Sequence, residues 1–238
     1  MIELGKKQKL LVVKTVDFGI YLGEDRNAPQ NERVLLPSKQ VPEGTKVGDE
    51  IEVFIYKDSQ DRLIATTREP MLQVGQTAVL KVKQVTRIGA FLDWGLEKDL
   101  LLPYHEQTNR VREGEECLVA LYVDKSSRLC ATMKVYHYLS TRTPYVPGDM
   151  VKGRVYEISG NFGVFVAVDD KYSALIPARE ATGKYRPGAI LDLRVTEVKE
   201  DGKMNLQACC HLMIMLHRKS SRESLVSART HSSVRSAI

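Results

Sequence analysis

Three segments of the chain share one pattern, in which a glycine and an aromatic residue precede a pair of aliphatic residues and a proline. The pattern occurs at residues 16–37, 85–103 and 158–177. The second and third copies align without a gap at a spacing of 74 residues, and the first copy carries a four-residue insertion within residues 23–33. A repeat of this length predicts three small domains rather than one large one.

Each copy indicates five short strands and no long helix. The fourth strand is the clearest, because apolar residues alternate in IEVFIY, CLVALY and LDLRVT, as in a half-buried strand. Five short strands in a unit this small favour a closed barrel of the oligonucleotide-binding (OB) type. We therefore predict an all-β chain with three tandem five-stranded OB-fold barrels, at residues 1–69, 74–137 and 147–207. The second linker, residues 134–147, is expected to begin with a helical turn.

The excess of positive charge lies in the last segment of the chain. Residues 1–207 contain 30 Lys and Arg against 29 Asp and Glu, whereas residues 208–238 contain five against one. The repeats could therefore bind a polyanion only through local patches and stacking. We predict an irregular, disordered C-terminal tail at residues 208–238, either the product of a shifted reading frame or a basic RNA-binding arm.

The N-terminal apolar run is too short for a signal peptide or a membrane span, so we expect a cytoplasmic protein without a membrane partner. The four cysteines then argue against disulfides. Cys117 and Cys130 stand in apolar columns of the repeat and should be buried. The adjacent Cys209 and Cys210 lack a metal-ligand spacing. No phosphate loop or nucleophile motif is present, so we expect no metal, no cofactor and no enzymatic activity.

The runs FGIYL, IGAFL and FGVFV, with the strand, turn and final Arg-aliphatic strand that follow, resemble the RNA-binding repeat of ribosomal protein S1. Three such copies with LLP or LIP on the third strand resemble the conserved virulence factor B family of bacterial RNA-binding regulators. The resemblance covers residues 1–207. It implies a protein that holds single-stranded RNA and regulates transcript fate or translation. It also implies a C-terminal winged helix, which we do not expect within residues 208–238.

The resemblance further implies a binding face built from two aromatic residues on the second strand, a His on the third, and an Asp and an Arg four residues apart before the fifth. The matching residues are Phe18, Tyr21, Asp58 and Arg62 in the first copy, Phe91, Asp124 and Arg128 in the second, and Phe162 and Phe165 in the third. Three departures from this pattern are visible: Ile88 at the first aromatic position, Val198 and Gly202 at the Asp and Arg positions of the third copy, and Pro37, Pro103 and Pro177 in the His column.

These residue types suit unpaired nucleic acid for a physical reason. An aromatic side chain on a barrel surface stacks on a base for about 1–3 kcal/mol with little sequence demand, and Arg can stack or meet a phosphate. An adjacent Asp would hold that Arg in place. Phe18 and Phe162 flank a bend and are equally compatible with core packing, whereas Tyr21, Phe91 and Phe165 are better candidates.

Two alternatives remain open from the sequence. Trp94 either replaces the aromatic residue missing at Ile88 or caps the end of its barrel. The partner is single-stranded RNA in the first hypothesis, with single-stranded DNA as a lesser possibility. In the competing hypothesis the barrels form a scaffold that docks a ribosome-associated or RNA-processing protein.

Overall fold

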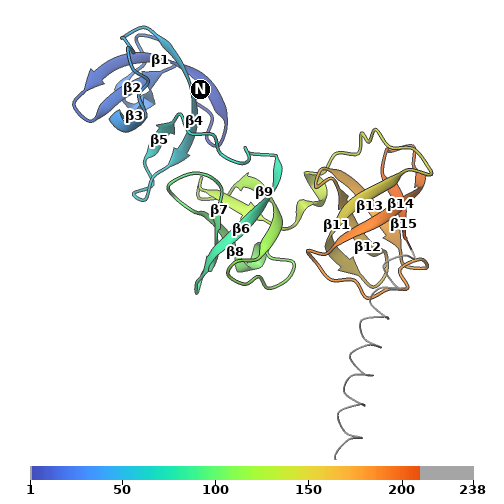
Figure 1. Ribbon diagram of the computed structural model, residues 1–238. Coiled ribbons are helices and arrows are strands. Elements are labelled where there is room, and N and C mark those ends of the chain that lie inside the picture. The colour runs from blue at the N-terminus through green and yellow to red at the C-terminus, as the bar shows by residue number, and fades with distance from the viewer. Residues whose placement is uncertain (1, 210–238) are drawn as a thin grey trace, which may run out of the picture. The chain divides into compact units, whose positions relative to one another are not determined.

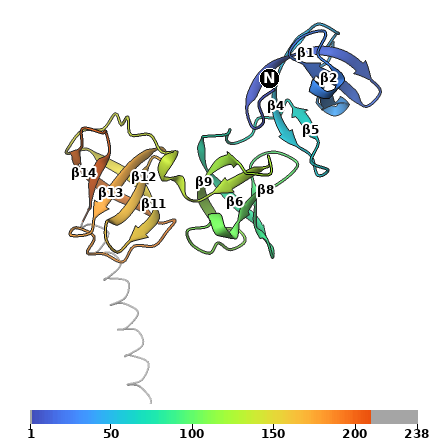
Figure 2. The same cartoon turned by 180° about the vertical axis from the view of Figure 1, so that it is seen from behind.

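The structure is a computed structural model that describes residues 2–209. These residues form three closed five-stranded barrels, seen in Figure 1 and from behind in Figure 2. Barrel 1 consists of β1 (Lys7–Val16), β2 (Gly19–Gly23), β3 (Val34–Pro37), β4 (Glu50–Lys57) and β5 (Leu63–Thr66). Barrel 2 consists of β6 (Thr77–Val85), β7 (Gly89–Asp93), β8 (Leu100–Pro103), β9 (Glu116–Val123) and β10 (Leu129–Thr132). Barrel 3 consists of β11 (Met150–Ser159), β12 (Gly163–Val168), β13 (Tyr172–Pro177), β14 (Ile190–Val198) and β15 (Met204–Ala208).

All three barrels have the same strand order. The first strand lies between the second and the fourth, and the fifth lies between the third and the fourth. The third and fifth strands pair in parallel, and the other pairs are antiparallel. The predicted all-β class and the three OB-fold barrels are thus confirmed. Most of the predicted tail, including Cys210, lies outside the described residues.

Side chains alternate between the interior and the outer surface along each second strand. In β2, Ile20 and Leu22 are buried in the barrel core while Tyr21 between them is only partly buried. The same alternation in β7 and β12 turns Phe91 and Phe165 outward. The period of two along a strand therefore decides which ring each barrel shows to solvent.

The glycine of the repeat is required by the close approach of the second and third strands. Gly19, Gly89 and Gly163 have φ angles of +153°, +151° and +119°. A Cβ atom at these positions would lie 2.1–2.3 Å from the carbonyl oxygen of Leu36, Leu102 or Ile176. No other residue fits such a position without moving the neighbouring backbone.

The chain divides into two compact units, one ending at Leu139 and one beginning at Ser140. The first contains barrels 1 and 2, which share one hydrophobic cluster: Phe54 and Tyr56 of β4 pack with residues of barrel 2. The second unit contains barrel 3, which has its own core.

Short 3-10 helices occupy several connections. The predicted helical turn after barrel 2 is confirmed as η4 (Val135–His137), and η1 (Gln30–Glu32) lies in the insertion of the first copy, while η2 (Ser38–Gln40) and η3 (Tyr104–Glu106) follow the third strands of barrels 1 and 2. Between residues 2 and 209, no helix has the length and apolar character needed to cross a membrane.

Candidate nucleic-acid interface

A row of outward side chains crosses the second, third and fifth strands of each barrel. These residues stand next to one another because the strands pair in the same register in each copy. The row is Tyr21, Leu35 and Ile64 in barrel 1, Phe91, Leu101 and Cys130 in barrel 2, and Phe165, Leu175 and Asn205 in barrel 3. The sequence indicated only the aromatic member of each row. The antiparallel pairing of the second and third strands adds the second member, and the parallel pairing of the third and fifth strands adds the third.

Two of the three rows are extended by a second, highly exposed aromatic ring. Phe18 is 57% exposed and Phe162 is 65% exposed. Their ring centroids lie 6.4 Å from those of Tyr21 and Phe165 respectively. The core alternative considered for Phe18 and Phe162 is therefore excluded. In barrel 2 the corresponding residue is Ile88, which is 61% exposed, so this face carries Phe91 as its aromatic residue.

Trp94 does not supply the missing ring. Its side chain is only 2% exposed, packs edge-on against Phe54 at a centroid distance of 5.8 Å, and donates a hydrogen bond from Nε1 to the carbonyl oxygen of Lys98 at 2.5 Å. A ring buried in this way offers no face to a base, so a stacking role for Trp94 is wrong. The alternative, packing at the end of the barrel, agrees with its position against barrel 1.

The predicted pairing of Asp58 with Arg62 is present in barrel 1. Asp58 Oδ2 accepts hydrogen bonds from Nε and Nη2 of Arg62 at 2.9 and 2.7 Å, and Oδ1 accepts from the backbone N–H groups of Gln60 and Arg62. Burial opposes the ionisation of Asp58, but these hydrogen bonds outweigh it and hold the pKa of the carboxyl below its ordinary value. Arg62 remains largely exposed.

In barrel 2 the expected pair does not form. Asp124 accepts hydrogen bonds from the backbone N–H groups of Ser126 and Arg128, as Asp58 does in its turn. The guanidinium of Arg128, however, forms an ion pair with Asp61 of barrel 1 at 2.5 Å. The expectation that Asp124 holds the Arg128 side chain is corrected, because the adjacent barrel places a second carboxylate within reach.

The last turn of the third copy begins at Lys199, which is 75 residues after Asp124 of the second copy and not 74. The third copy therefore contains one additional residue before this turn. A β-bulge between Val195 and Glu197 of β14 absorbs this residue. The turn is closed by a hydrogen bond from the N–H of Lys199 to the carbonyl oxygen of Lys203, equivalent to those from Asp58 to Arg62 and from Asp124 to Arg128.

The backbone conformation of the turn confirms this alignment, because in each copy the residue just before the last turn residue has a positive φ angle. This residue is Asp61, Ser127 and Gly202 in the three copies. Lys199 and Lys203, rather than Val198 and Gly202, thus occupy the Asp and Arg positions of barrel 3, and the gap-free alignment is wrong in this segment. A cation is retained at the Arg position as Lys203, which is paired with Asp201 at 2.9 Å. The single-residue bulge concealed this residue from the sequence pattern.

Cys117 and Cys130 are buried, as predicted. Burial and the nearby carboxylate of Asp124 raise the pKa of the Cys130 thiol to about 11, so it stays protonated at neutral pH. Among residues 2–209, no group of His, Cys, Asp and Glu side chains is arranged to hold a metal ion.

The fold and the faces define the class: a protein of tandem OB-fold barrels whose outward faces carry aromatic and basic side chains. The family model of the S1 domain matches residues 4–68 and 74–134. The chain therefore belongs to the S1-domain family. Barrel 3, beyond the matched residues, has the same strand order.

Two relatives share most of this chain. It is 31% identical over 214 residues to the uncharacterized protein YitL of Bacillus subtilis, and the alignment covers 85% of this chain and 69% of YitL. It is 24% identical over 188 residues to conserved virulence factor B of Staphylococcus aureus, covering 74% of this chain and 62% of the relative. The chain thus spans about two thirds of the length of these relatives.

A crystal structure of a multidomain protein with nucleic acid binding domains from Streptococcus pneumoniae has the same fold. The TM-score is 0.55 at 20% sequence identity, and the alignment covers 92% of this chain and 81% of that one.

Proposed function

We propose that this chain is a non-catalytic protein that binds single-stranded RNA on the outer faces of its barrels and thereby influences transcript fate or translation. The observation that carries this proposal is the exposed aromatic pair of two barrels, Phe18 with Tyr21 in barrel 1 and Phe162 with Phe165 in barrel 3. The turn before the fifth strand of the same barrel adds a cation, Arg62 paired with Asp58 or Lys203 paired with Asp201. Membership of the S1-domain family and the nucleic acid binding domains named for the pneumococcal protein support it.

The faces suit an unpaired strand because they provide rings and cations without a deep pocket. Each exposed ring can stack on one base whatever its identity, and the nearby Arg or Lys can meet the adjacent phosphate. Several weak faces on one strand gain from effective concentration, so no single barrel has to bind strongly. In barrel 3, Asn205 stands in the row where barrels 1 and 2 have Ile64 and Cys130. The amide of Asn205 donates a hydrogen bond to Glu197 at 2.7 Å.

Replacing Phe162 and Phe165 together by Ala in the full chain should weaken binding of a labelled, unstructured RNA oligonucleotide. Loss of two stacking rings worth about 1–3 kcal/mol each predicts an affinity at least about 30-fold lower. Fluorescence anisotropy titrations at several salt concentrations measure this change. Phe162→Leu, which keeps an apolar side chain but removes the ring, should lose part of the affinity.

Ile190→Ala is the matched control, because Ile190 is a similarly exposed apolar residue of the same barrel that lies on β14, outside the aromatic row. Its affinity for RNA should equal that of the original chain. Equal binding by the Phe162→Ala, Phe165→Ala variant would refute the role of this face. Absence of any RNA binding would favour the protein-docking scaffold, and competition with a DNA oligonucleotide of the same sequence would show whether the sugar matters.

The lysines of the last turn should contribute to the salt dependence of binding. Changing Lys199 and Lys203 to Gln removes two cations and should reduce the slope of log K against log salt by about 1.4, since each phosphate contact on a single strand contributes about 0.7. Lys152→Gln on β11 removes an exposed cation from the same barrel outside the face and serves as the control. An unchanged slope in the double variant would place the RNA elsewhere.

A further inference from the structure

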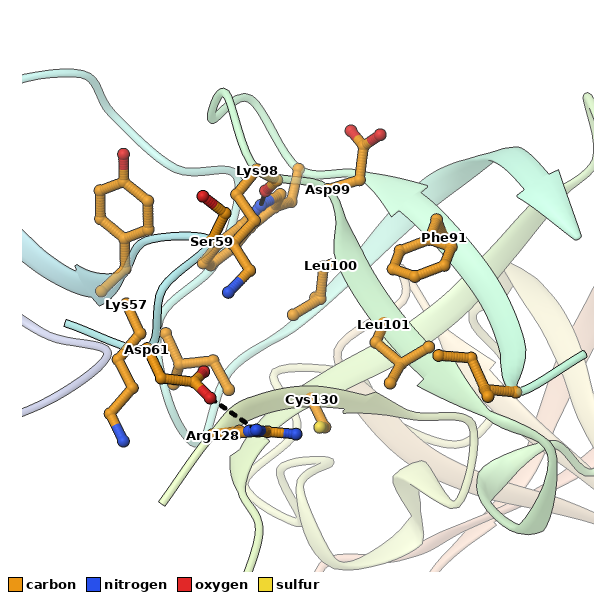
Figure 3. Close-up of a pocket in the computed structure, with 14 residues that line it drawn as sticks. Lys57, Ser59, Asp61, Phe91, Lys98, Asp99, Leu100, Leu101, Arg128 and Cys130 are labelled. Atoms are coloured by element: carbon orange, nitrogen blue, oxygen red, sulfur yellow. Dashed lines mark hydrogen bonds and ion pairs between the residues drawn. The ribbon is translucent and has the colours of Figure 1, made fainter. Parts of the chain in front are cut away.

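A pocket of about 270 Å³ lies where barrel 1 meets the outer face of barrel 2. One wall is the hairpin between β4 and β5, which contributes Lys57, Ser59 and Asp61. Figure 3 shows these residues across the pocket from Phe91 and Leu101 of barrel 2, with Arg128 near the lower edge. The face of barrel 2 is therefore a two-sided site rather than an open surface.

Several contacts hold the hairpin over this face. Trp94 packs on Phe54 of β4, and the Nζ of Lys98 donates a hydrogen bond to the carbonyl oxygen of Asp58 in the hairpin at 2.7 Å. Arg68 and Glu97 form a further ion pair between the barrel 1 side and barrel 2, at 3.2 Å. The walls of the pocket are thus fixed by packing as well as by charge.

The residues that line the pocket are apolar at its floor and charged around it. Phe91, Leu100 and Leu101 give an aromatic and aliphatic floor, and Lys57, Lys98 and Arg128 bring three cations to the site. Of the two acidic lining residues, Asp99 is paired with Lys83 at 2.8 Å, and Asp61 is paired with Arg128. A flat apolar floor beneath cations matches a nucleobase joined to a phosphate. The pocket volume of about 270 Å³ lies just below the usual range of ligand pockets, so it suits one nucleotide rather than a longer segment.

We infer that the junction pocket binds a single unpaired nucleotide of the RNA, with its base on Phe91 and its phosphate at Arg128, and that Asp61 competes with this phosphate for the guanidinium. The inference rests on the proposed function and adds to it a composite site that neither barrel forms alone. It also assigns Asp61 a role opposite to that of Asp58. Asp58 orients Arg62, whereas Asp61 forms an ion pair with Arg128, the cation that would bind the phosphate.

Trp94 provides a site-specific signal, because it is the only tryptophan of the chain and lines this pocket. Adding an unlabelled, unstructured RNA oligonucleotide to the full chain should quench Trp94 emission, and Phe91→Ala should remove most of the quenching. In parallel, anisotropy with the labelled oligonucleotide measures the total affinity.

Asp61→Asn should raise the affinity about 3- to 10-fold at low salt, because it releases Arg128 and removes a negative charge from the phosphate position. Arg128→Ala should lower the affinity, and Asp61→Asn should give no gain in the Arg128→Ala background. Glu3→Gln is the control, since it removes a carboxylate from an exposed ion pair with Lys6 that neither lines the pocket nor joins the two barrels.

The outcomes separate this inference from the proposed function. RNA binding by anisotropy with unchanged Trp94 emission, or an equal gain from Asp61→Asn and Glu3→Gln, would overturn the junction site and leave the faces of barrels 1 and 3 as the binding surface. Absence of binding in both measurements would overturn the proposed function and the junction site together. Quenching that depends on Phe91, with a gain that requires Arg128, supports both.

Discussion

Replacing Gly163 by Ala is expected to destabilise barrel 3 by about 3 kcal/mol or more, through steric overlap and a backbone conformation that L-residues avoid. A Cβ atom would lie 2.1 Å from the carbonyl oxygen of Ile176 and 2.6 Å from the backbone nitrogen of Ala178. Both contacts are with backbone, which cannot rotate away, so β12 and β13 would have to separate where they pair at Gly163 and Pro177. Hydrogen exchange followed by mass spectrometry on β12 and β13 peptides measures the loss of protection.

Gly160→Ala is the control, because Gly160 lies in the same turn and a methyl group added there would have no neighbouring atom within 4 Å. Its stability should change by less than about 0.5 kcal/mol. Barrels 1 and 2 should keep their protection in both variants, since barrel 3 belongs to the other compact unit with a separate core. Equal protection of β12 in the Gly163→Ala and Gly160→Ala variants would show that the strand pair tolerates a side chain at Gly163.

The parts of the fold that depend on local pattern could be predicted from the sequence. Alternation along the second strand buries Ile20 and Leu22 and leaves Tyr21 outward, and the repeat places the same alternation at Phe91 and Phe165. The glycine before each ring marks a backbone approach that only glycine permits. Because these features are set within a few residues, three degenerate copies were enough to define the barrels.

The parts that depend on distant contacts could not be read from the pattern. The bulge in β14 shifts Lys203 into the position of Arg62, and its only trace in the sequence is one extra residue in the fourth strand. The partner of Arg128 lies 67 residues away in another barrel. No single-copy pattern contains that information, because each copy is aligned as though its barrel stood alone.

Barrel 2 differs from the other two barrels at the first aromatic position, where it has the exposed Ile88. Barrels 1 and 3 place Phe18 or Phe162 beside the ring of the row. In barrel 2 the hairpin of barrel 1 lines the pocket with Ile88 and Phe91. Under the junction-site inference, the single ring of Phe91 holds one base, where the two rings of barrels 1 and 3 stack two.

Trp94→Ala is expected to cost about 3–5 kcal/mol of unfolding free energy, because it removes a large buried ring from the cluster shared by barrels 1 and 2. Trp94→Phe, which keeps a ring against Phe54, should cost less. Hydrogen exchange should show reduced protection in β4 as well as β7, since the lost contact joins the two barrels. Ile88→Ala, at an exposed residue of the same barrel, should change stability by less than about 0.5 kcal/mol. Loss of protection confined to β7 would mean that barrel 1 is not stabilised by Trp94. It would also contradict the conclusion that Trp94 fixes the barrel 1 wall of the pocket.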